Sequence, residues 1–391
     1  MFIYPWDILD EGIDPVLSYL AEDVGVDAIH LATTYHSVKM LLPHNPRRKM
    51  LCLDSSGAYF QPEEGFYATT PIKPVMSPWA KGSNPLADIA TGCKRHGLGL
   101  VSWTLSLHDD LLPSRHPHAA QKNVFGDLVP YNLCPSSPEA RAYVVGLAKD
   151  LSTNYDLSGV ELESAYFGGL GHRYNHEKGP YLNLGPQGEF LFSLCFCENC
   201  LRRAKKVGID IDQLQGAVRK RLEMALSKVD PAGSNPRGVE ELLPEIEGLG
   251  EFVRMREQAV TSLIQEVKEG ISTRLHFLLM GEKWTNGTDN AAIARVCDIF
   301  EITCYSSSPE AVRTRVEGVA PDLRDLGQLA AILSISHSHA PSAEALEGLV
   351  EELAGLGLSK IIFYNYGLVP REGLGWVERA ARLFREREFQ V

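Results

Sequence analysis

The sequence predicts an α/β fold of the (β/α)8 TIM-barrel type. Eight apolar runs rich in β-branched and aromatic residues end in polar residues, as expected of barrel strands. Helical periodicity fills most of the intervals between them, and eight such units are the number that closes a parallel barrel. The predicted strands are residues 2–6, 27–36, 98–108, 159–164, 275–283, 298–305, 329–338 and 360–367.

Amphipathic helices are predicted at residues 13–24, 84–96, 138–152, 290–296, 308–317, 343–355 and 372–387. Two intervals, 37–83 and 165–274, are much longer than an ordinary connection, and the second contains charged helical stretches at 201–227 and 249–269. Insertions at this end of a barrel build its active-site face. We therefore predict one domain, 1–391, with loop insertions after strands 2 and 4, the latter (170–270) carrying a cysteine cluster and helices.

The charge balance restricts the partners. The 391 residues contain 38 Lys and Arg against 50 Asp and Glu, a net charge of −12, without a long basic stretch. Nucleic acid and anionic membrane surfaces are therefore not expected partners. The opening MFIYPWDILDEG lacks the basic and apolar regions of a signal peptide, and no apolar run is long enough to span a bilayer. These features predict a cytoplasmic protein and leave homo-oligomer formation open.

Two glutamates in the segment GVELES, Glu161 and Glu163, alternate with apolar residues and therefore share one face of the fourth strand. The same alternation directs Glu301 and Tyr305 into the barrel. Glu163 lies at the strand tip, where barrel enzymes keep their chemistry. Glu161 and Glu301 lie deeper in the barrel. For these two residues a structural role, in hydrogen bonds or ion pairs that fill the interior, is as well supported as a role in catalysis.

Paired carboxyl groups are the apparatus of glycoside hydrolysis, in which one protonates the leaving oxygen and the other attacks or activates water. We predict Glu163 as the general acid, with Glu282 from the neighbouring strand as its partner and Glu301 as the next candidate. The proximity of Glu161 favours a raised pKa for one of the two acids.

Polar and aromatic residues at the other strand ends complete the predicted carbohydrate site. Flat rings beside polar groups suit sugars, although aromatic residues also serve simply in packing. The candidate substrate-binding residues are Tyr35, His36, His108, Asp109, Glu161, Tyr166, Trp284, Tyr305, His337 and Tyr364.

Three cysteines, Cys195, Cys197 and Cys200, form a C-x-C-x-x-C motif that supplies three of the four ligands of a structural zinc site. Cys134 precedes a predicted helix in the strand-3 loop, which adjoins the strand-4 loop in a barrel, and is the predicted fourth ligand. The prediction is structural Zn²⁺; separate reduced thiols or redox use are the alternatives.

The run from 134-CPSSPEAR through 154-NYDLSGVELES to 195-CFCENCLRRA resembles the central part of the glycoside hydrolase family 42 β-galactosidases and related uncharacterised glycosyl-hydrolase-like barrels. The resemblance implies zinc on the four cysteines and acid/base work for Glu163. Family 42 has Asn-Glu at this strand end, where this chain has Leu162-Glu163, and a nucleophilic glutamate on strand 7. Here strand 7 provides His337 and His339 instead, so the resemblance does not carry over the β-galactosidase activity.

The sequence therefore predicts a glycoside hydrolase that acts on a small oligosaccharide or glycoside. A carbohydrate-binding barrel without hydrolytic activity is the first alternative, because strand 7 lacks the acid. A metal-dependent lyase or isomerase is the second alternative. Its metal ion would be surrounded by histidines, with Glu163 or Asp109 as a further ligand; the histidines are His36, His108, His337 and His339.

Overall fold

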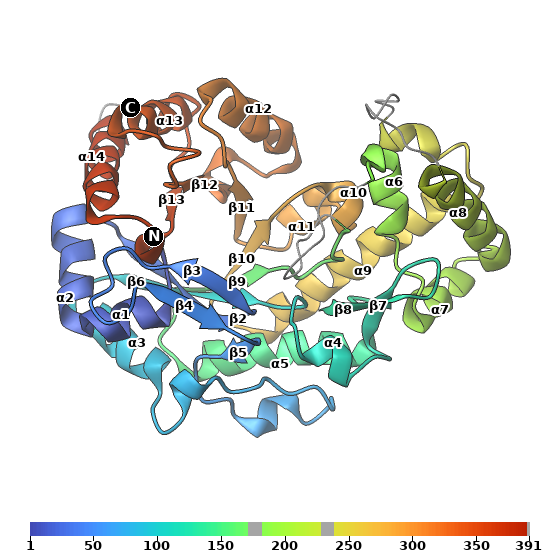
Figure 1. Ribbon diagram of the computed structural model, residues 1–391, viewed down its shortest axis with the longest axis horizontal. Coiled ribbons are helices and arrows are strands. Elements are labelled where there is room, and N and C mark those ends of the chain that lie inside the picture. Colours follow the sequence, from blue (N-terminus) through green and yellow to red (C-terminus); the bar gives the residue numbers. More distant parts are fainter. Residues whose placement is uncertain (171–181, 228–237, 389–391) are drawn as a thin grey trace.

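The computed structural model describes residues 1–170, 182–227 and 238–388, so part of the predicted 170–270 insertion lies outside the described residues. Eight parallel strands form a nearly closed barrel, with β1 and β13 side by side where the circle meets (Figure 1). In order around the barrel they are β1 (Phe2–Ile3), β2 (Ala28–Tyr35), β6 (Gly99–Leu105), β9 (Gly159–Glu163), β10 (Arg274–Leu279), β11 (Ile299–Thr303), β12 (Leu329–Ser334) and β13 (Ile361–Tyr364). The prediction of a (β/α)8 barrel is confirmed.

Helices surround the barrel, and each predicted helix is present. Three of them begin with the same local signal: Asn84, Ser137 and Ser308 each accept a hydrogen bond from the first turn, and a proline follows. The surrounding helical segments are α1 (Pro5–Glu11), α2 (Ile13–Ser18), η1 (Tyr19–Val24), α3 (Pro85–Arg95), α5 (Pro138–Asn154), α9 (Leu249–Gly270), α11 (Asn290–Ala294), α12 (Pro309–Val319), α13 (Ala343–Gly355) and α14 (Arg371–Glu388).

All eight strands end one to four residues before the predicted ends, and at β1 and β10 the cause is local. Pro5 starts α1 and limits β1 to two residues. After β10, Gly281 has a φ of 75°, which turns the chain into α10 (Lys283–Asn286). Strand alternation therefore stops before Glu282, and the face that this residue presents does not follow from the alternation in β10.

Insertions follow three of the strands. The β3 (Val38–Leu41) and β4 (Met50–Leu53) hairpin and β5 (Gly57–Ala58) follow β2, and α4 (Leu112–Arg115) with the β7 (Ala120–Lys122) and β8 (Leu128–Leu133) hairpin follows β6. The insertion after β9 contributes α6 (Gly185–Phe192), α7 (Glu198–Lys206) and α8 (Ile211–Leu226). Short helical turns are η2 (Glu64–Tyr67), η3 (Pro78–Ala80), η4 (Val239–Leu242), η5 (Ala320–Asp322), η6 (Leu326–Gln328) and η7 (Tyr366–Leu368).

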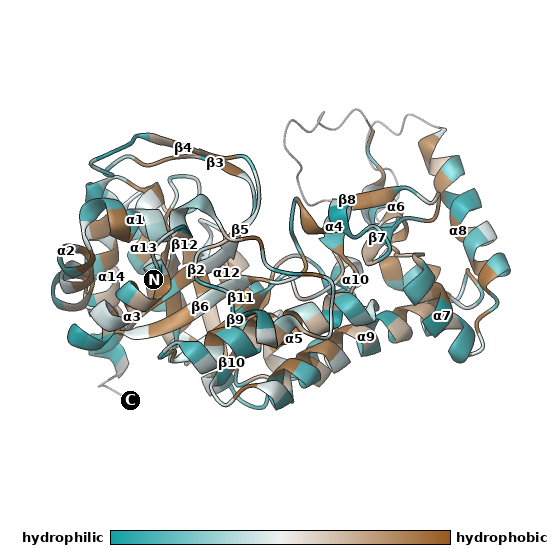
Figure 2. Ribbon diagram, turned by 90° about the horizontal axis from the view of Figure 1, so that it is seen from below, coloured by the Kyte–Doolittle hydropathy of each residue, from teal (hydrophilic) through white to brown (hydrophobic). Residues whose placement is uncertain are grey.

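The β9 insertion and the β7–β8 hairpin form a second lobe beside the barrel (Figure 2). This lobe has a hydrophobic core of its own, which includes Phe190, Leu214 and Val218. Helix α9 belongs to both parts: its first half, around Phe252, packs in the lobe, and its second half, around Leu263, packs against the barrel. One continuous helix thus couples the lobe to the barrel.

Aromatic side chains fill much of the barrel interior. Phe2, Tyr4 and Trp103 lie there with small and aliphatic residues from β10 to β13. Across the described part of the chain, the structure contains no helix with the length and apolarity of a membrane span.

Candidate active site

Glu163 is the last residue of β9 and is only partly buried. Its Oε2 accepts a hydrogen bond from the indole Nε1–H of Trp103 on β6. Loss of hydration raises the pKa of Glu163 to about 7, against the lowering effect of this donor. The next residue, Ser164, has a φ of 56°, a conformation uncommon outside glycine that turns the chain away from the strand. The sequence thus ends β9 with a carboxyl group held at the carboxyl face.

Three tyrosine hydroxyls meet beside this carboxyl group. The Tyr4 hydroxyl lies 2.8 Å from that of Tyr35 and 3.0 Å from that of Tyr364, which joins the ends of β1, β2 and β13. Burial raises the pKa of all three, and the charge of Glu163 adds to the effect on Tyr35 and Tyr364. They are therefore neutral phenols that can donate hydrogen bonds.

Further rings extend this surface. The ring of Tyr305 lies 5.9 Å from that of Tyr364 and is stacked on His339 at 5.6 Å. The Tyr166 hydroxyl accepts a hydrogen bond from the backbone N–H of Met280 at 3.3 Å. Flat apolar faces and hydroxyl groups are thus concentrated around Glu163.

The predicted histidines and Asp109 are only partly brought together. The His36 ring stacks on Tyr35 at 4.4 Å and lies 5.1 Å from the ring of His108. Loss of hydration lowers the pKa of His36 and favours its neutral form. Asp109 accepts the backbone N–H groups of Leu111 and Leu112, both at 2.7 Å, so its carboxylate stabilises the start of α4.

Other predicted site residues lie elsewhere. Glu282 is exposed at the start of α10, and His337 is exposed after β12. The Trp284 ring lies 6.3 Å from that of Phe190, against the core of the lobe. Glu161 and Glu301 are fully buried and hydrogen-bond to His30 and His276, respectively.

Trp103 lies in this group of side chains but is not among the residues that the sequence indicated. Strand alternation places Trp103 on the same face of β6 as Leu105, toward the barrel interior. A buried indole N–H needs a hydrogen-bond acceptor. An inward-facing tryptophan on a barrel strand therefore indicates, from the sequence, a hydrogen bond to a polar residue of the interior.

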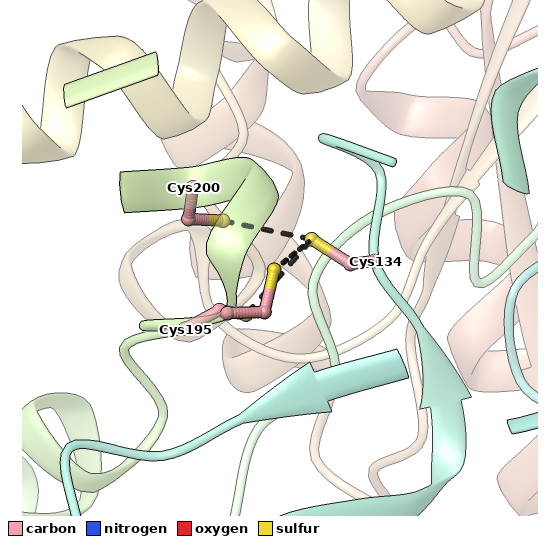
Figure 3. Close-up of side chains that lie close together, drawn as sticks. Cys134, Cys195 and Cys200 are labelled. Atoms are coloured by element: carbon pink, nitrogen blue, oxygen red, sulfur yellow. Dashed lines mark hydrogen bonds between the residues drawn. The ribbon is translucent and has the colours of Figure 1, made fainter. Parts of the chain in front are cut away.

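The four cysteines Cys134, Cys195, Cys197 and Cys200 meet at the junction of the lobe and the barrel. All four are buried, and their sulfurs lie within 4.8 Å of one another. The sulfur of Cys134 is 3.5 Å from those of Cys197 and Cys200 and 3.9 Å from that of Cys195; Figure 3 shows it facing Cys195 and Cys200. Sulfurs at about 2.3 Å from a tetrahedral zinc ion lie about 3.8 Å apart, so the arrangement fits a metal ion.

Two arginines lie near this cluster. Arg256 is fully buried and donates to the carbonyl oxygens of Trp284 and Thr285 at 3.0 and 2.7 Å. Burial lowers its pKa to about 10, which still leaves it charged at neutral pH. Arg203 also feels the charge of Cys134 and Cys200. Four thiolates around a divalent ion would carry two net negative charges, which these two arginines would offset.

The fold is similar to that of solved glycosidases. An α-L-fucosidase isoenzyme 2 from Paenibacillus thiaminolyticus has 11% sequence identity and a TM-score of 0.54, over 96% of this chain and 46% of its own. A β-galactosidase from the psychrophilic Marinomonas ef1 has 10% identity and a TM-score of 0.57, over 98% of this chain and 59% of its own. The chain thus spans only about half the length of these two proteins.

No family model and no curated protein matches the sequence. At these identities, the likeness to the two glycosidases establishes the TIM-barrel fold and leaves activity to the chemistry of the site.

Proposed function

We propose that the protein is a glycoside hydrolase that uses Glu163 as its general acid on a small oligosaccharide or glycoside. The position of Glu163 carries this proposal: a partly buried carboxyl group at the tip of β9, bonded to Trp103 and surrounded by neutral tyrosines. An acid for glycosidic cleavage must reach the leaving oxygen, and the carboxyl face of a barrel is where substrates bind. The glycosidase fold of the two solved relatives agrees with this role.

The tyrosine hydroxyls and the histidines serve as hydrogen-bond partners of the sugar in this proposal. Buried neutral phenols can donate to sugar hydroxyls, and His36 in its neutral form can donate or accept. The rings of Tyr305 and Tyr364 provide the apolar faces that sugar C–H groups contact.

We further propose Glu282 as the second carboxyl group. It follows β10, the strand adjacent to β9, and lies in the loop on the same side of the barrel. Because it is exposed, its side chain is free of the packing that fixes Glu301 against His276. We propose that the chain is related to glycoside hydrolase family 42 and to the similar uncharacterised barrels.

A carbohydrate-binding barrel without hydrolytic activity is the second candidate. It is favoured by one observation: neither Glu282, which is exposed, nor Glu301, which is bonded to His276, is held against Glu163. Catalysis by paired carboxyl groups needs both at about 5–10 Å across the substrate.

The variant Glu282→Gln tests which candidate is correct. If Glu282 is the nucleophile or base, we expect turnover to fall by about 10²-fold or more for good and poor leaving groups alike, because the step it performs does not depend on leaving-group protonation. Initial rates on aryl glycosides with a range of leaving-group pKa values measure this. Unchanged rates in Glu282→Gln exclude Glu282. A wild-type protein that binds sugars in calorimetry but hydrolyses none of a broad glycoside panel supports the binding barrel.

The four cysteines, we propose, hold a structural zinc ion with no part in turnover. The thiolate donor set, the sulfur spacing and the complete burial fit a closed four-ligand site, in which no position is open for substrate. Such an ion would tie the β8–α5 junction, which contains Cys134, to the insertion after β9.

A further inference from the structure

A second polar cluster lies inside the barrel, and its member on β9 precedes Glu163 by two residues. It consists of His30 on β2, Glu161 on β9, His276 on β10 and Glu301 on β11. His30 hydrogen-bonds through Nδ1 to Glu161, and His276 Nδ1 lies 2.7 Å from Oε1 of Glu301. The two imidazole rings are 5.9 Å apart. Four side chains from four strands therefore converge on one point of the interior.

The carboxyl groups of Glu161 and Glu301 lie close enough to hydrogen-bond to each other, and one oxygen of each has no other partner among the described residues. These oxygens are Oε1 of Glu161 and Oε2 of Glu301, and both glutamates are 0% exposed. A buried carboxylate is costly unless a hydrogen bond, an ion pair or a metal ion compensates it. Donor atoms of His30, Glu161 and Glu301 all lie within 4.8 Å of one another, the scale of a metal coordination shell.

The positive charge nearby does not fill this need. The Met1 amino group lies close enough to feel both glutamates, but it donates to the carbonyl oxygen of Ala28 at 3.0 Å. The cluster thus concentrates carboxyl oxygens from two strands at one point.

A cavity of about 340 Å³ reaches the cluster from the amino-terminal ends of the strands. His30, His276 and Glu301 line it, and its rim includes the exposed residues Asp27, Arg274 and Ser359. Solvent and a hydrated ion can therefore enter from the side of the barrel opposite to Glu163.

We propose that His30, Glu161 and Glu301 bind a divalent first-row transition-metal ion at the amino-terminal end of the barrel, with His276 orienting Glu301. Mixed imidazole and carboxylate ligands suit Mn²⁺, Fe²⁺ or Zn²⁺, whereas Ca²⁺ and Mg²⁺ prefer oxygen ligands alone. Carboxylates that bind a metal ion are commonly oriented by a hydrogen bond from a residue that does not itself bind the ion, and His276 provides such a hydrogen bond to Glu301. Water from the cavity completes the coordination. The ion links β2, β9 and β11 and neutralises the buried carboxylates.

Binding of Mn²⁺ to the full chain tests this proposal, because thiolate sites select softer ions and the four cysteines are poor Mn²⁺ ligands. We expect electron paramagnetic resonance to detect one tightly bound Mn²⁺ per chain, with coupling to an imidazole nitrogen. In Glu161→Gln and Glu301→Gln the affinity should fall at least tenfold. Asp27→Asn, which changes a carboxylate at the cavity rim, is the matched control and should keep the wild-type affinity.

Two measurements on the wild-type protein keep the test decisive if the glutamine variants do not fold. Its thermal midpoint should rise with Mn²⁺ concentration, as mass action requires for an ion that binds the folded state. If another ion already occupies the site after purification without chelators, elemental analysis should find one metal ion per chain beyond the thiolate-bound one. Two results would overturn the proposal and leave a metal-free hydrogen-bonded cluster. In the first, the wild-type chain carries no such ion and binds no Mn²⁺ with nitrogen coupling. In the second, both glutamine variants bind Mn²⁺ as tightly as the wild type.

Discussion

Replacement of Glu163 by Gln should reduce turnover of a glycoside with a poor leaving group by about 10²–10⁴-fold, the usual contribution of a positioned acid. Glutamine keeps the shape of the side chain and still accepts the hydrogen bond from Trp103, but it has no proton to transfer. Substrates with activated leaving groups need little protonation and should lose much less. Rates over a series of aryl glycosides measure the difference.

The thermal stability of Glu163→Gln should remain close to that of the wild type, because Glu163 is only partly buried and its contact with Trp103 survives. Glu269→Gln is the matched control: Glu269 is exposed near the end of α9, outside the site, and its loss should leave the rates unchanged. Full activity of Glu163→Gln on a poor leaving group would show that another residue is the acid.

Cys200→Ser should remove the thiolate-bound metal and destabilise the fold by more than about 4 kcal/mol, as loss of a structural metal site does. Cys200 is fully buried, and its sulfur lies 3.5 Å from that of Cys134. Serine has nearly the same volume but is a poor ligand for zinc. Denaturant unfolding gives the change in stability, and elemental analysis gives the zinc content. Cobalt-substituted wild type should show thiolate-to-metal charge-transfer absorption that the variant lacks.

Cys304→Ser separates this effect from the cost of a buried hydroxyl group. Cys304 is buried to a similar degree but lies outside the four-cysteine cluster. We expect it to cost about 1–3 kcal/mol, the penalty for burying an unpaired hydroxyl, and to leave the metal content unchanged. Zinc content and stability that are equal in Cys200→Ser and Cys304→Ser would exclude a structural zinc.

The sequence by itself determined the barrel. Alternating apolar residues and helical periodicity are local properties, so all eight strands and the surrounding helices follow from them. Local alternation also placed Glu163 at a strand tip and Glu161 and Glu301 inside. The clustering of Cys195, Cys197 and Cys200 follows from their spacing, and barrel adjacency indicated Cys134.

Only the tertiary structure decided which of these groups meet. His30 and Glu161 are 131 residues apart in the chain, and Trp103 and Glu163 are 60 apart; no local pattern encodes such pairs. Alternation specifies the face of a strand but not the level in the barrel, which depends on how neighbouring strands are staggered. Glu282 could not be placed for a second reason. The left-handed backbone of Gly281 ends the extended geometry of β10, so side-chain alternation does not continue to Glu282.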